Sequence, residues 1–147
     1  MTEAFENKIK EIVESLKTSS FSYVFSTKNG ANHILENTPM PVVVNVLPIS
    51  GTIEMKSNTI ASAPNCLIGF FDKLGETDVP EADAKEINTR MFLAAQEFIV
   101  KANASGYFKQ LKEIQYQNIE QYDIGCFGIV LDVQLHENSG TLICSLK

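Results

Sequence analysis

This sequence lacks the motifs that mark most enzymes and metalloproteins. It has only three cysteines and two histidines in 147 residues, and the cysteines never form the CxxC pair of zinc knuckles and redox motifs. Neither a GxSxG nucleophile motif nor a glycine-rich phosphate loop after a strand is present. We therefore predict that the chain is not an enzyme, and we expect no catalytic residue, no metal site and no cofactor.

The few histidines and cysteines are also poorly spaced for chemistry. His33 and His136 stand away from other candidate metal ligands, so we interpret them as surface or hydrogen-bonded side chains. Cys126 and His136 are ten residues apart in one predicted strand, about 33 Å, which argues against a catalytic pair. We interpret Cys66, Cys126 and Cys144 as small buried hydrophobic residues in a reducing compartment.

Clustered cations and long apolar runs are missing as well. The formal charge is −6, and tight nucleic-acid binding needs clustered Lys and Arg, so the composition disfavours it. An acidic surface is instead compatible with a channel or ring through which DNA passes. The longest apolar runs stay far below the ~20 residues of a membrane span, and the N-terminus lacks a secretory-signal layout. We expect synthesis in a cytoplasm.

What the sequence does contain is typical of one globular domain. Hydrophobic residues make up 44% and charged residues 20% of the chain, and nine Phe and four Tyr supply bulky core material. The length suits a single core. We therefore expect residues 1–147 to form one domain.

Two segments have helical periodicity. Residues 3–17 form an amphipathic pattern after Thr2, a suitable N-cap, and the longest helix is expected from Pro80 to about Ala104. The apolar face of the first is Phe5, Ile9, Ile12, Val13 and Leu16; that of the second is Ile87, Met91, Ala94, Ala95, Phe98 and Ala102. Six acids lie between Asp72 and Glu86, without the spacing of a calcium loop, and we interpret them as the solvated start of the long helix.

The remaining segments indicate strands. We expect them at 21–26, 42–47, 52–57, 66–71, 114–122, 127–136 and 142–146. The polar, small-residue stretch 58–64 is expected to be a connector. The order predicts an α+β fold, with a mostly antiparallel sheet flanked by an N-terminal helix and one long helix.

The pattern leaves open whether one face of this sheet is exposed. Phe70 and Phe71 are adjacent in a strand, so they point to opposite faces. If both helices cover the same side, the residues left on the other would be Phe71, Leu67, Val43 or Leu47. An open apolar face would mark an interaction site. The alternative is that the first helix covers this face.

The layout resembles a known family, the tail-terminator and head–tail joining (neck) proteins of tailed bacteriophages. The segments that carry the resemblance are 65–73, leading through an acidic loop into 91–99, and the stretch 122–129. They look like structural proteins of phages that infect Bacteroides-like hosts. The resemblance covers nearly the whole chain and lies in element order, with a first helix, antiparallel strands, a long helix and a closing hairpin.

The resemblance implies a virion protein that forms a ring of six or twelve copies at the phage neck or tail. Its partners would be a portal or neck ring, tail proteins, and DNA that passes without specific binding. Subunits would meet through strand edges, the long helix and loops. The family offers no residue motif to carry over, and our candidate interface residues are Leu67, Phe71, Val43, Asp78 and Glu81.

The alternative hypothesis is a small bacterial ligand- or peptide-binding α+β module, with the acidic loop as a lid. A pocket between the long helix and the sheet, lined by apolar groups and a few polar ones, would favour it. An enzyme would require His33, His136 and the acids of 72–86 to converge in space.

Overall fold

The computed structural model describes residues 2–27, 30, 37–73, 80–121, 125–138 and 141–142. Its helices are α1 (Glu3–Glu14) and α3 (Pro80–Ser105). Its strands are β1 (Ser22–Ser26), β2 (Val42–Val46), β3 (Gly51–Met55), β4 (Thr59–Lys73), β5 (Gln115–Gln121), β6 (Cys126–Gln134) and β7 (Thr141–Leu142). The predicted α+β fold is confirmed.

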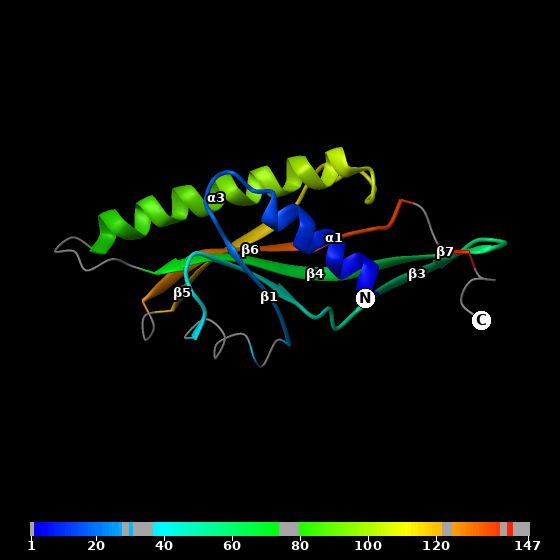
Figure 1. Cartoon of the computed structure of the whole chain (residues 1–147), viewed down its shortest axis with the longest axis horizontal. Helices are drawn as coiled ribbons and strands as arrows, with labels where there is room; N and C mark the ends of the chain where they lie inside the picture. The colour runs from blue at the N-terminus through cyan, green and yellow to red at the C-terminus, as the bar shows by residue number, and fades with distance from the viewer. Residues whose placement is uncertain are drawn as a thin grey trace.

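The strands form one sheet around the long central strand β4. Their order is β1-β2-β4-β6-β5, and β3 and β7 also pair with β4 (Figure 1). β1 runs parallel to β2, and the other pairs are antiparallel. The sheet is therefore mostly antiparallel, as the alternating patterns predicted.

The prediction of a connector at 58–64 is wrong, because β4 continues through this segment as a strand of 15 residues. Its small polar composition looks like a loop, but β3 and β7 pair with this half of β4 on its two edges. Ala61 and Ala63 are buried there. Small side chains at these positions let neighbouring segments approach closely.

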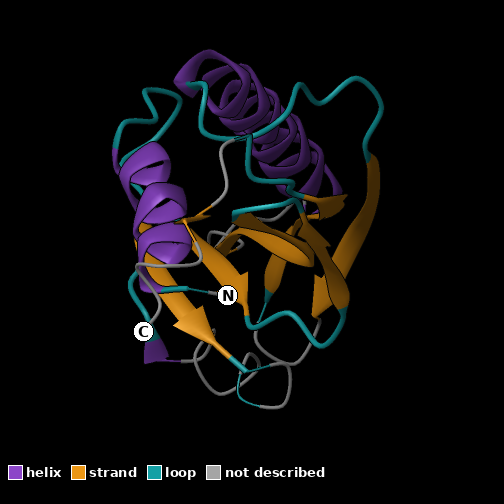
Figure 2. Ribbon diagram, turned by 90° about the vertical axis from the view of Figure 1, so that its right-hand side faces the viewer, coloured by secondary structure: helices purple, strands orange, loops and turns teal. Residues whose placement is uncertain are grey.

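Both helices lie on the same face of the sheet (Figure 2). The predicted apolar faces of α1 and α3 are buried at every position named above, and they share one core cluster with Val43, Ile68 and Phe70. The Phe5 N–H donates to the Thr2 hydroxyl at 3.2 Å, so Thr2 caps α1 as expected. Hydrophobic periodicity and capping thus position both helices.

The face away from the helices carries a second, smaller cluster. Val42, Val44, Phe71 and Cys126 are its buried members. The Phe71 ring lies against two glycines on this face: a Cβ at Gly69 would stand 2.3 Å from Phe71 Cε2, and one at Gly128 would stand 2.5 Å from Phe71 Cδ1. The absence of side chains at both positions lets the ring lie flat on the sheet.

Candidate interaction surfaces

The most prominent exposed feature is an arm, which we define as β3 together with Thr59–Pro64 of β4. It extends beyond the helix-covered part of the sheet (Figure 1). The Lys56 N–H donates to the Thr59 carbonyl at 2.9 Å and closes the tip. Ile53 and Met55 project from one face of the arm and are 71% and 69% exposed. Large apolar side chains this exposed, side by side on a strand, mark a candidate contact surface.

The opposite face of the arm is held against the rest of the chain. Glu54 lies 2.8 Å from His136 Nε2, 3.3 Å from Lys56 Nζ and 3.7 Å from Lys109 Nζ. Hydrogen bonds from Lys56 and then His136, together with the charge of Lys109, lower the pKa of Glu54. Because Glu54 is engaged within the chain, the Ile53 side is the face that remains for other contacts.

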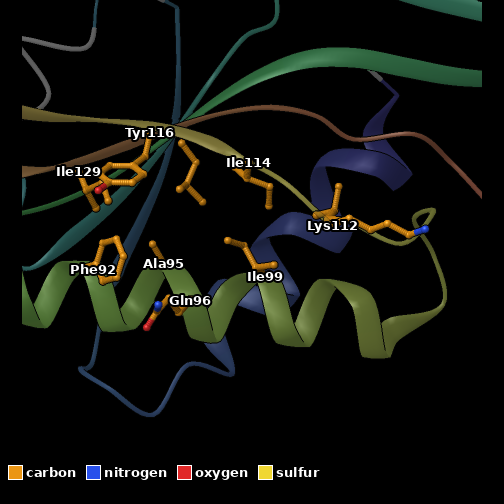
Figure 3. A pocket seen from close by; sticks show the side chains of 10 residues that line it. Phe92, Ala95, Gln96, Ile99, Lys112, Ile114, Tyr116 and Ile129 are labelled. Carbon is orange, nitrogen blue, oxygen red and sulfur yellow. The ribbon is translucent and has the colours of Figure 1, made fainter.

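A groove runs between α3 and the start of β5. It has a volume of about 220 Å³, and its walls face each other across the gap (Figure 3). The lining residues are Phe92, Ala95, Gln96, Ile99, Leu111, Lys112, Ile114, Tyr116, Ile129 and Leu131. The Phe92 and Tyr116 rings meet edge to face at one end, with centroids 5.4 Å apart. The Lys112 side chain extends away from the apolar walls (Figure 3), so the inside of the groove is apolar.

The outer face of α3 adds exposed apolar groups beside this groove. Leu93 and Val100 are seven residues apart, so they lie on one side of the helix, and both are exposed. The neighbouring charges are used within the chain instead: Arg90 bonds Asp72 at 2.6 Å and Glu86 at 3.0 Å. The groove and α3 therefore form a second surface, separate from the arm.

A carboxylate clamp fixes the end of α1 to α3. Glu97 accepts hydrogen bonds from the Lys17 N–H at 2.9 Å, the Thr18 N–H at 3.0 Å and the Thr18 hydroxyl at 2.8 Å. Lys101 lies 3.5 Å from the same carboxylate. Burial would raise the pKa of Glu97, but these donors outweigh burial and lower it. The clamp positions α3 and hence one wall of the groove.

The predicted interface residues differ in their burial and in the face of the sheet on which they lie. Val43 was expected on an open face, and this is wrong, because it is fully buried under the helices. Phe71 does lie on the face away from the helices, but it is only 6% exposed. Leu67 is half-buried on that face. Asp78 and the side chain of Glu81 lie outside the described residues.

Groups that could do chemistry do not converge within the described residues. His136 pairs with Glu54 beside Ala61, near the start of β4, whereas Asp72 pairs with Arg90 near its end. Ala61 and Asp72 are eleven positions apart in β4, a distance of about 37 Å. The described part of the chain contains no cluster of His, Cys, Asp and Glu that could hold a metal ion. His33 lies outside it.

Two of the cysteines are buried, as predicted. Burial raises the pKa of Cys66 to about 12 and that of Cys126 to about 11. Thiols with such pKa values are poor nucleophiles. Cys144 lies outside the described residues.

Comparison with known proteins adds no family assignment. No protein-family model matches the chain, and no curated protein matches it. In the described part of the chain, no helix has the length and apolar character required to span a membrane.

Proposed function

We propose that this chain is a structural subunit of a tailed bacteriophage, and that it assembles into a ring of six or twelve copies at the neck or tail. The observation that carries the proposal is the presence of two separate exposed apolar surfaces, the arm with Ile53 and Met55, and the groove with the outer face of α3. The resemblance in element order supplies the phage context.

Two different surfaces on one chain suit head-to-tail assembly. A twofold dimer uses the same patch on both subunits, whereas a ring uses one patch to contact a different patch on the next subunit. The arm and the groove belong to different parts of the fold, since the arm extends beyond the helices and the groove lies beneath α3. A chain of such contacts closes into a ring when the rotation between neighbours allows it.

The charge of the chain is consistent with this role. The formal charge is −6 and the isoelectric point is about 4.9, so the surface as a whole repels the phosphate backbone. A ring through which DNA travels needs this property more than it needs affinity, because bound DNA would be held back. The neighbouring partners would be a portal or neck ring on one side and tail proteins on the other.

Negative-stain electron microscopy of the purified chain, alone and mixed with phage neck and tail proteins, tests the proposal. We expect rings with a central opening, formed by the chain itself or on the end of a tail tube. Images that contain only single subunits under both conditions would contradict it.

A second candidate function is favoured by the groove itself. A pocket between the long helix and the sheet, apolar inside and with Gln96 and Lys112 among its lining residues, also suits a small ligand or peptide. Native mass spectrometry of the purified chain distinguishes the two. A co-purified small molecule on a monomer would favour the binding module, whereas a ligand-free multimer would favour the virion subunit.

A further inference from the structure

We infer that the arm of one copy adds as an extra strand to the edge of β5 opposite β6 in the next copy, with Ile53 and Met55 inserted into the groove beneath α3. The inference rests on the proposed head-to-tail assembly, and it names the two surfaces that meet.

Both strands have an edge for this pairing. β5 ends the strand order and pairs with β6 on one side, and within the described residues no strand pairs with its other edge. Among the strands that the structure describes, β3 pairs with β4 alone. Such edges carry rows of backbone N–H and C=O groups that another strand can satisfy. The lengths allow this pairing, since the five residues of β3 fit along the seven residues of β5.

The register of the sheet brings the inserted side chains to the correct face. Tyr116 pairs with Leu131 across β5 and β6, and its ring contacts Phe92 of α3, so Tyr116 points toward the helix side. A strand added outside β5 places every second side chain beside Tyr116, under the flank of α3. Ile53 and Met55, two residues apart, lie on one face and enter the groove together.

The dimensions agree with this insertion. Residues two apart on a strand are about 7 Å apart, and the groove wall from Phe92 to Ile99 spans seven helical steps, about 10 Å. The groove has a volume of about 220 Å³, and an engineered apolar cavity of about 150 Å³ takes a benzene molecule. The groove is therefore long enough to receive Ile53 and Met55 together, and its volume can hold a large part of both side chains.

The charges on the two surfaces also agree. Ile53 and Met55 are apolar, and the inner walls of the groove are apolar, with Lys112 directed outward. The arm's own carboxylate, Glu54, is on the opposite face and bonded within its chain. Pairing these surfaces therefore buries apolar area and places no charged side chain inside the groove, where loss of water would be costly.

Cysteine cross-linking between two variants tests the contact in the full chain. Ile53→Cys and Met55→Cys are each mixed with Tyr116→Cys and oxidised, since a disulfide needs Cα atoms about 4.4–6.8 Å apart. We expect a covalent dimer from at least one mixture and none from any variant alone. Thr52→Cys, on the opposite face of the arm, is the matched control and should not cross-link to Tyr116→Cys. The wild-type chain, oxidised in parallel, controls for the native cysteines.

A second measurement uses association strength. The double variant Ile53→Asp/Met55→Asp should weaken self-association about 100-fold or more, because two large apolar side chains are lost from the contact. Its circular dichroism spectrum should match that of the wild type, because both residues are exposed. Ile49→Asp is the control, because Ile49 is 81% exposed and belongs to neither surface; it should weaken association far less.

The outcomes separate this inference from the proposed function. Rings that persist in the double variant, or that form without any arm-to-groove cross-link, would overturn the inference and leave the ring proposal standing. Cross-linking of Ile53→Cys to itself would indicate a twofold contact and would also overturn it. A wild-type chain that stays monomeric with its phage partners would overturn both.

Discussion

Removing the Glu97 carboxylate should destabilise the fold measurably at neutral pH. In Glu97→Ala, the Lys17 and Thr18 N–H groups and the Thr18 hydroxyl lose their acceptor. A hydrogen bond to a charged group contributes about 1.5–3 kcal/mol. The site is partly exposed, so water replaces part of the lost hydrogen bonding. We therefore expect a net loss of about 2–3 kcal/mol in the free energy of unfolding. For a domain of this size, that lowers Tm by about 5–10 °C.

The pH dependence of the loss follows from the lowered pKa of Glu97. A carboxyl group whose pKa is lower in the folded state stabilises the fold at pH values above its unfolded pKa, about 4.3. This contribution disappears as the pH falls through the lower, folded pKa. The stability difference between wild type and Glu97→Gln should therefore be largest near pH 7 and shrink in acid below about pH 4.

Urea unfolding followed by circular dichroism, at pH 7 and in a series down to pH 3, measures both effects. Glu11→Gln is the matched control, because Glu11 forms an exposed pair with Lys8 on α1, and such pairs contribute about 0–1 kcal/mol. The reasoning would be refuted if Glu97→Ala unfolded at the wild-type urea concentration at pH 7, or if the loss were the same at all pH values.

Three further experiments test other parts of the fold. Asn45→Val should change the free energy of unfolding by only about 1 kcal/mol in urea titrations. Asn45 Oδ1 is buried without a hydrogen-bond partner among the described residues, which offsets the loss of the 3.1 Å bond from Asn45 Nδ2 to the Tyr23 hydroxyl; a loss above about 2 kcal/mol would contradict this. Gly128→Ala should cost about 2–4 kcal/mol, because its Cβ would lie 2.0 Å from the Phe70 carbonyl oxygen, and a near-neutral result would show that β4 and β6 can separate locally. Cys66 and Cys126 should resist a thiol reagent in the folded chain and react after unfolding, since burial raises their pKa to about 12 and about 11. Mass spectrometry of the labelled chain shows which cysteine has reacted. Rapid labelling of either cysteine in the folded chain would count against its burial.

The helices were predictable because their signals are local. The apolar spacing of α1 and α3 follows the 3.6-residue period, and Thr2 is a cap that can be recognised in the sequence. The adjacent pair Phe70 and Phe71 was likewise correctly placed on opposite faces, because strand alternation depends only on the backbone.

The exposure of single residues was not predictable, because it depends on strand register. Val43 lies under the helices because it is paired with Phe70, and only the register decides that. Phe71 is buried because Gly69 and Gly128 come together beneath its ring, although they are 59 residues apart. Neither contact leaves a periodic signal in the sequence.

The two surfaces were missed for a related reason. The segment 52–57 has ordinary strand alternation, which by itself suggests that Ile53 and Met55 pack inward. A hint lay in the small, polar residues of 58–64, since a hairpin partner of this kind gives large side chains little to pack against. The groove joins α3 to β5, and the sequence alone does not place these two elements side by side.

Sedimentation velocity of the wild-type chain beside the Ile53→Asp/Met55→Asp variant tests head-to-tail assembly most directly. The 16.3 kDa chain should sediment as a discrete species of six or twelve copies, alone or with its neck and tail partners, and the variant should sediment as a monomer with an unchanged fold. A wild-type chain that sediments as a monomer of 16.3 kDa at every concentration, with and without those partners, would contradict the account.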